Sequence, residues 1–187
     1  MHEARPGHEL QFSRMIEQGV SIARGIFAMN SANVEGWALY AESEMKPYLP
    51  LDGQLASLQH RMLRAARAYL DPMLNLGQIT PEEAKRVLME DVVLSEGMAK
   101  QEVDRYTFRA PGQATSYFFG YQSMLETRQR AELALNGRLD RQRFNDFVLA
   151  QGMLPPDLRL RAVMEEFVPA EKSRIASSKT TPKATTN

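Results

Sequence analysis

The chain of 187 residues is 43% hydrophobic and 25% charged, which is enough for one folded domain with a sizeable core. Its 23 basic and 23 acidic side chains cancel, and no stretch interleaves Lys or Arg with aromatic residues, which argues against nucleic acid as a partner. The absence of cysteine excludes disulfides, thiolate nucleophiles and cysteine-based metal sites.

No run of apolar residues approaches the ~20 that a bilayer-crossing helix needs. The first residues also lack the charged and then apolar pattern of a secretory signal. We therefore expect a soluble chain without a membrane span. The composition leaves its compartment unknown.

The opening stretch, MHEARPGHELQ, places two of the three histidines around Glu3 and Pro6-Gly7. In the HExxH pattern two histidines one helical turn apart bind zinc, and the glutamate is the general base. Here His8 follows His2 by six positions, which a regular helix would rotate by roughly 240°. Because Pro and Gly interrupt helices, we predict a bulge that turns both rings together. On spacing alone, a chance match in a frayed terminal segment is the favoured interpretation.

The stretch NVEGWALYAE, residues 33–42, reads as a helix on which Glu35, Leu39 and Glu42 share one face. Carboxylates beside a large apolar surface are either buried ligands or solvated edges. The pattern alone favours solvated edges. His60, the remaining histidine, lies on the polar flank of an Arg-rich helix and is expected to be solvated.

Helical spacing continues along the chain, and no alternating strand pattern exceeds a few residues. We predict an all-α fold, an irregular multi-helix assembly, with Thr80 and Ser95 as helix N-caps. The tail from about residue 170 is polar and rich in Lys and Thr, so we expect a helical domain over 1–169 and a disordered tail over 170–187. The predicted helices cover 55–70, about 81–89, a segment that starts at 95, about 114–135, about 140–150 and 156–167.

Six motifs occur in order: HEARPGHELQ, VEGWALYAE, QEVDRY, PGQATSY, TRQRAE and QGMLP. Together they resemble the bacterial family catalogued as domain of unknown function 885, from His2 to about Val168. That family is usually placed among zincin-like metallopeptidases of the gluzincin type. Six ordered motifs are far more specific than one, so the resemblance favours a zinc site over a chance match.

The resemblance implies that His2, His8 and Glu35 bind zinc (Zn²⁺) and that Glu3 is the general base. Such a two-His, one-Glu site keeps one position open for water. The implied reaction is hydrolysis of a peptide or other amide substrate by metal-activated water, with Glu3 passing the proton to the leaving nitrogen.

The developing oxyanion needs a second electrophile, for which Tyr106, Tyr117 and Tyr121 are the candidates. Arg105 and Arg128 are candidates to bind a substrate carboxylate. Core packing for Tyr117 and a solvated helix face for Arg128 are equally good interpretations of the same residues.

The chain departs from the family pattern at Glu9, where members often carry a second histidine, and at residues 71–75, which read DPMLN where many members have Asp-x-Gly-x-His. Members usually run to several hundred residues with a long helical region before the HE motif, and full-length relatives can be exported. The chain therefore resembles the C-terminal half of such a protein. We expect either a zinc-dependent peptidase-like hydrolase completed by an N-terminal half or a separate chain, or a catalytically inactive helical remnant or interaction module. Whether the chain alone is an enzyme stays open.

Overall fold

The computed structural model describes residues 1–180, and all regular structure in that range is helical. This confirms the predicted all-α class. Three five-residue π-helical segments and one 3₁₀ turn interrupt or connect the α-helices. The α-helices are α1 His8–Glu17, α2 Ser31–Met45, α3 Leu51–Asn75, α4 Pro81–Glu90, α5 Glu96–Asp104, α6 Thr115–Ala134, α7 Arg141–Ala150, α8 Pro156–Ala162 and α9 Val168–Thr180.

Local capping explains why several helices begin where the sequence predicts. The Thr80 hydroxyl accepts the Glu83 amide at the start of α4, and the Glu83 carboxylate accepts the Thr80 amide at 2.7 Å. This reciprocal pair satisfies two backbone donors that the first helical turn leaves free. Ser95 and Asp140 cap α5 and α7 in the simpler one-bond manner.

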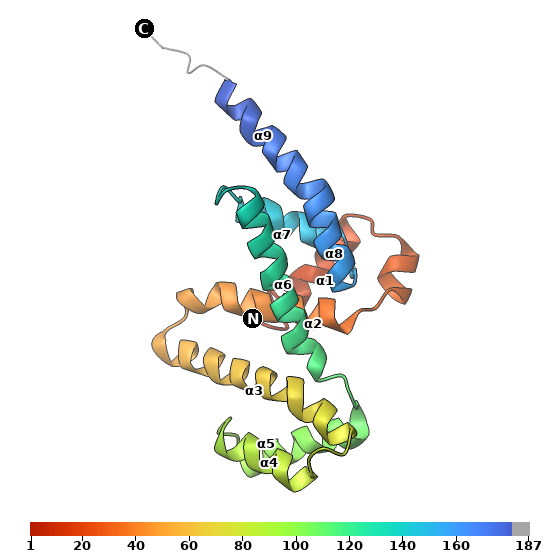
Figure 1. Cartoon of the computed structure of the whole chain (residues 1–187), viewed down its shortest axis with the longest axis vertical. Helices are drawn as coiled ribbons and strands as arrows, with labels where there is room; N and C mark the ends of the chain where they lie inside the picture. Colours follow the sequence, from red (N-terminus) through yellow and green to blue (C-terminus); the bar gives the residue numbers. More distant parts are fainter. Residues whose placement is uncertain (181–187) are drawn as a thin grey trace.

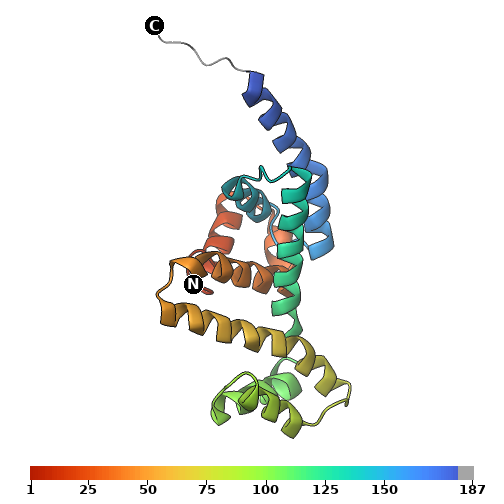
Figure 2. The ribbon, with the colours of Figure 1, turned by 60° about the vertical axis from the view of Figure 1, so that its left-hand side comes forward.

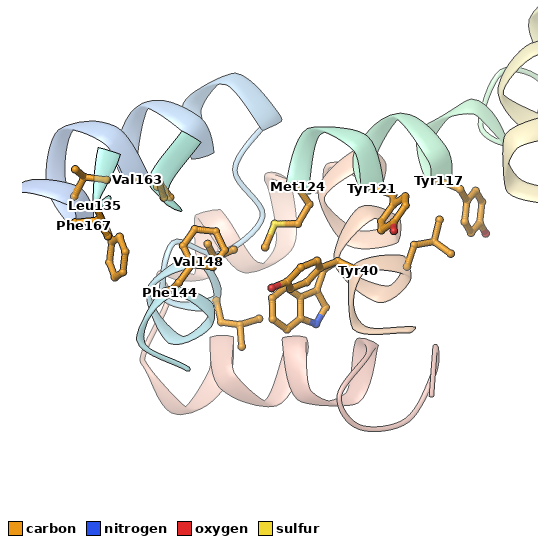
Figure 3. Packing of buried hydrophobic residues seen from close by; sticks show 14 residues of the cluster. Tyr40, Tyr117, Tyr121, Met124, Leu135, Phe144, Val148, Val163 and Phe167 are labelled. Carbon is orange, nitrogen blue, oxygen red and sulfur yellow. The ribbon is translucent and has the colours of Figure 1, made fainter. Parts of the chain in front are cut away.

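The molecule is elongated, with α9 leading away at one end and α4 with α5 at the other (Figure 1). One hydrophobic cluster joins α2, α6, α7 and the segment Val163–Phe167, and Figure 3 shows Tyr40 of α2 within it beside Met124 of α6. A second cluster joins α3, α4 and α5 and includes Tyr106. The long helices α3 and α6 connect the two clusters, so the chain start, which lies between α2 and α3 in both views, sits near the middle (Figure 2).

Helices α2 and α6 cross at a point where two glycines meet. A methyl group on Gly36 would overlap the backbone of Gly120, and one on Gly120 would overlap the carbonyl oxygen of Ala32. Only glycine permits so close an approach of two backbones. The crossing therefore fixes the position of Glu35, the residue before Gly36.

The C-terminal part differs from the predicted disordered tail, because residues 170–180 belong to α9. Glu171 is only 1% exposed, and its carboxylate accepts hydrogen bonds from Arg143 at 2.7 Å and from Arg174 at 2.8 Å. These contacts tie the helix to α7, so the domain continues past 169. The remaining predicted tail, 181–187, lies outside the described residues.

None of the helices within residues 1–180 combines the length and the apolar character that a bilayer crossing requires.

Candidate metal centre

The two N-terminal histidines are brought together by an irregular turn that precedes α1. The His8 amide donates to the His2 carbonyl at 2.8 Å, and the Glu9 amide donates to the Glu3 carbonyl at 3.1 Å. Each bond spans six residues where an α-helix spans four, so the extra residues are looped out. The ring centroids of His2 and His8 are 4.8 Å apart and nearly perpendicular. The predicted bulge thus lies before the first helix rather than within it.

Gly7 and Trp37 hold this turn in place. A methyl group on Gly7 would overlap the carbonyl oxygens of Met1 and His2, so another side chain would force the turn open. The indole N–H of Trp37, from α2, lies 3.0 Å from the Pro6 carbonyl and 3.3 Å from that of Gly7. Helix α2 therefore anchors the backbone that carries both histidines.

Glu35 faces both imidazoles through one carboxylate oxygen. Its Oε2 is 3.2 Å from Nε2 of His2 and 3.5 Å from Nε2 of His8. Ligands bound tetrahedrally to zinc at ~2.0–2.1 Å lie about 3.3 Å from one another. Both separations therefore fit two edges of a zinc coordination tetrahedron. In the described part of the chain, the group whose potential ligand atoms all lie within 4.8 Å of one another consists of His2, Glu3 and His8, so a second carboxylate borders the same space.

Glu42 orients the first histidine. Its Oε1 is 2.8 Å from Nδ1 of His2, on the ring edge away from Glu35. A carboxylate that binds one ring nitrogen of a metal-binding histidine fixes the tautomer and leaves the other nitrogen for the metal. Nδ1 of His8 is buried and has no such partner among the described residues.

The cluster holds a proton that a cation would replace. Burial lowers the pKa of His2, but the hydrogen bonds to Glu35 and Glu42 outweigh burial and raise it to about 9. Burial raises the pKa of Glu35, but its bonds to His2 and His8 outweigh this effect and lower it to about 2. One imidazolium thus lies between two carboxylates. Nitrogen and oxygen donors around an excess of negative charge fit a divalent ion such as zinc.

Tyr117 and Arg105 adjoin this cluster. The Tyr117 ring stacks on the His2 ring with centroids 6.1 Å apart and planes 24° apart. The Tyr117 hydroxyl accepts a hydrogen bond from Nη2 of Arg105 at 2.9 Å, and the same guanidinium binds Gln113. The structure therefore brings Tyr117 beside His2, and it pairs Tyr117 with Arg105.

A sequence model of the family described as "Bacterial protein of unknown function (DUF885)" matches residues 1–164. The chain belongs to this family. Its structure is similar to "the putative lipoprotein from Colwellia psychrerythraea", with a TM-score of 0.83 and 31% identity over 90% of this chain and 29% of that one. It is also similar to "a putative lipoprotein of unknown function from Shewanella oneidensis", with a TM-score of 0.74 and 26% identity over 88% of this chain and 30% of that one. This DUF885 chain thus spans less than a third of either structure. The comparison with curated proteins gave no match.

Two carboxylates of this DUF885 chain are not the solvated edges that the residue pattern favoured. The side chains of Glu35 and Glu42 are only 15% and 13% exposed, because the N-terminal turn covers the face of α2 that carries them. The role of Glu42 was missed, although its seven-residue separation from Glu35 on one helical face was visible. His60 is exposed on α3, as expected.

Three other candidates have their polar groups bound elsewhere. The Tyr106 hydroxyl donates to Glu102 at 2.8 Å inside the second hydrophobic cluster, and burial raises its pKa strongly. Tyr121 is buried in the first cluster with the Arg61 guanidinium over its ring. Arg128 donates to Glu44 at 2.7 Å, so its charge is already paired. These contacts favour packing roles over contact with substrate.

Proposed function

We propose that this chain carries the metal-binding part of a zinc-dependent hydrolase that cleaves peptide or related amide bonds. The observation that carries the proposal is the position of one Glu35 oxygen, 3.2 Å and 3.5 Å from the Nε2 atoms of two histidines. A turn that requires glycine at position 7 holds those histidines together. The descriptions of both similar structures as lipoproteins support an exported location for a family-length enzyme.

His2, His8 and Glu35 would hold the ion through Nε2, Nε2 and Oε2. Bound there, zinc would polarise the substrate carbonyl and lower the pKa of water to about 7. Glu42 keeps the His2 ring in the orientation that directs Nε2 toward Glu35.

Glu3 is the proposed general base. Its ligand atom lies within 4.8 Å of those of both histidines, and the residue is exposed, so its carboxylate reaches water at the site. It accepts a proton from the water that attacks the carbonyl carbon. It then delivers that proton to the amide nitrogen as the carbon–nitrogen bond breaks.

Tyr117 is the proposed oxyanion donor. Its phenol oxygen already accepts an N–H from Arg105, so its own hydroxyl proton is available for another acceptor. A neutral donor aimed at the developing oxygen charge is the usual second electrophile in such sites. Arg105 thereby acts through Tyr117 as a positioning residue.

Metal content tests the proposal. The purified chain, loaded with zinc and then desalted, is expected to keep one equivalent, and His8→Ala is expected to keep none. His60→Ala is the matched control, because it removes an exposed histidine from α3 and is expected to keep the zinc. Equal zinc in wild type and His8→Ala would reject the site.

The two acids that border the histidines have different roles in this proposal. Glu35→Gln is expected to lose zinc. Glu3→Gln is expected to keep zinc and to lose hydrolysis of a peptide substrate in a family-length protein. The reverse pattern would make Glu3 the ligand and Glu35 the base, which the grouping of His2, Glu3 and His8 within 4.8 Å also permits.

An exposed apolar stripe on α3 favours a second candidate function, a helical interaction module. Four exposed apolar side chains recur at helical spacing along α3: Leu51, Leu55, Leu58 and Met62. Exposed apolar stripes of this kind mark surfaces for protein partners. Concentration-dependent self-association that Leu55→Glu abolishes, in a chain that keeps no zinc, would favour the module over the hydrolase.

A further inference from the structure

A cavity of about 390 Å³ opens beside His2, between the chain start, α2 and α3. His2 and Glu42 form one wall, and α3 forms the other. Small-molecule sites occupy roughly 300–1,000 Å³, so the space suits a group the size of an amino-acid residue.

The α3 wall consists of one helical face. Five residues of α3 line the cavity, and their spacing of three or four positions places them on one side of the helix: Gly53, Ala56, Ser57, His60 and Arg64. Ala56 and Ser57 are adjacent in the sequence, and each follows Gly53 by one helical turn. The first three of these five residues have small side chains, and their small size creates the hollow. The face ends in the guanidinium of Arg64, so a charged group lies at one end of a small-residue wall.

Two polar atoms on this wall have no hydrogen-bond partner among the described residues. They are Nε of Arg64 and Oγ of Ser57, and both are buried. The other Arg64 contacts are long, at 3.2 Å to the His60 carbonyl and 3.4 Å to Glu42. Arg67, one helical turn further, instead holds Glu102 through two bonds of 2.6 Å and 2.7 Å. Arg64 is therefore a guanidinium with one unpaired donor, Nε, and two long contacts, and a planar carboxylate is the group that completes it best.

The charges around the cavity are compatible with an anion. Glu42 lines the cavity as an acid, but its carboxylate is bound to Nδ1 of His2 at 2.8 Å and contacts Arg64. The other titratable groups on the lining residues are the imidazoles of His60 and His2 and the amino group of Met1. The carboxylate of a ligand thus meets Glu42 when Glu42 is already bonded to His2. The ligand competes with Glu42 only for Arg64, whose contact with Glu42 is the longer of the two, at 3.4 Å.

We propose that this cavity binds the C-terminal residue of a short peptide, with Arg64 holding its terminal carboxylate and the Gly53–Ser57 turn accommodating its side chain. The inference deepens the proposed function and rests on it, since it places the terminal residue beside His2. It makes the hydrolase an enzyme that removes residues from the C-terminus. It also assigns carboxylate binding to Arg64 in place of Arg105 and Arg128, whose guanidinium groups bind Tyr117 and Glu44.

Paired probes test this assignment on the full chain after treatment with a chelator. N-acetyl-alanyl-alanine and its carboxamide are titrated while the ring signals of the histidines are followed by NMR, because two of the three histidines line the cavity. The free carboxylate is expected to bind roughly tenfold more tightly than the carboxamide, as a charge-assisted hydrogen bond would give.

Substitutions on α3 identify the residue responsible. Arg64→Gln is expected to remove the preference for the carboxylate, and Arg64→Lys to restore part of it, since lysine keeps the charge but loses the planar fork. Arg61→Gln, with the same change of charge on the same helix, is expected to keep the preference. Equal binding of the two probes to wild type, or an unchanged preference in Arg64→Gln, would overturn the proposal.

Ala56→Leu provides a second route in case Arg64→Gln does not fold. Residue 56 is exposed and lines the cavity, so leucine there reduces the cavity volume, and both probes should bind more weakly. Unchanged binding would count against the cavity. Zinc uptake, measured on separate aliquots of the same proteins after they are loaded with zinc and desalted, separates the two proposals. A preference without zinc uptake supports the cavity and rejects the hydrolase, whereas zinc uptake without a preference rejects only the cavity.

Discussion

Two clusters of acidic and basic side chains lie at similar depth in this chain, and they differ in how completely their polar atoms are bonded. In the first, Glu102 accepts two bonds from Arg67, at 2.6 Å and 2.7 Å, and one from Tyr106 at 2.8 Å. In the second, a single Glu35 oxygen faces two imidazoles at 3.2 Å and 3.5 Å. The shorter bonds are typical of a finished network, and the longer contacts match the separation expected of two ligands of the proposed ion.

The difference separates structure from function in physical terms. A buried charge pair whose hydrogen bonds are all made stabilises one arrangement of the chain and has nothing left to offer a ligand. The histidine cluster holds three carboxylates beside the imidazolium of His2 and the guanidinium of Arg64, so it keeps an excess of negative charge that a cation would offset. The predictions below test this contrast from both sides.

The largest expected effect concerns the finished network. Glu102→Gln leaves the Arg67 guanidinium buried without its counter-charge, which should lower the free energy of unfolding by about 3 kcal/mol. Chemical denaturation measures the loss. Glu90→Gln, which breaks an exposed pair with Arg86, is the control and should cost less than about 0.5 kcal/mol. Equal losses in the two variants would contradict the contrast.

The same substitution has a pH dependence of known sign. Burial raises the pKa of Glu102, but the bonds from Arg67 outweigh burial and lower it below its ordinary value. The stabilisation is therefore present above the pKa of a carboxyl in the unfolded chain, about 4.3, and is lost as the pH falls through the folded value. The difference in stability between wild type and Glu102→Gln should shrink in acid. A constant difference from pH 7 to pH 3 would refute the assignment.

The next effect concerns the turn that pairs the histidines. Gly7→Ala should open the turn, because the added methyl overlaps the His2 carbonyl, and zinc affinity should fall by roughly a hundredfold or more, beyond the loss expected for a supporting residue. Calorimetric titration with zinc measures the change. Gly97→Ala is the control, since a methyl there meets nothing within 4 Å. Wild-type zinc affinity in Gly7→Ala would show that this turn is not what brings the His2 and His8 rings together.

A smaller effect is expected from the residue that orients His2. Glu42→Gln should weaken zinc binding roughly tenfold, the lower end of the range for such supporting residues, because Nδ1 of His2 loses its charged partner. Glu44→Gln, two positions along α2, keeps the His2 contacts and should leave the zinc affinity unchanged. An effect of the same size in both variants would point to net charge instead of orientation.

The smallest effect is the proton that leaves when the ion enters. Because the pKa of His2 is about 9 without metal, zinc binding near pH 7 should release about one proton from this residue. Titrations in buffers of different ionisation enthalpy count the protons. Zinc affinity should rise with pH below 9. Proton release close to zero would mean that His2 is not a ligand.

The sequence predicted what short-range chemistry determines. At the helix starts Thr80 and Ser95, the side chain caps a backbone amide only three residues further along the chain. Both partners of the hydrogen bond therefore lie within one short stretch of sequence. The looped turn between His2 and His8 was predictable for the same reason, because Gly7 and its neighbours supply both the interruption and the constraint.

Long-range packing explains what the sequence did not predict. Glu35 and Glu42 are shielded by a turn more than 25 residues earlier, and Glu171 is held by Arg143 of another helix. Neither contact can be predicted from the spacing of residues along the sequence. The unpaired donor of Arg64 was equally invisible, because Arg61, Arg64 and Arg67 look alike in an Arg-rich helix until their partners are known.

The indole of Trp37 has a further consequence. By holding the carbonyls of Pro6 and Gly7, it makes α2 a template for every proposed ligand, since the same helix also presents Glu35. Helix α3 supplies a wall of the adjoining hollow but no ligand. Under the proposed function, substitutions along α3 would therefore change the hollow while the residues proposed to bind the ion keep their positions.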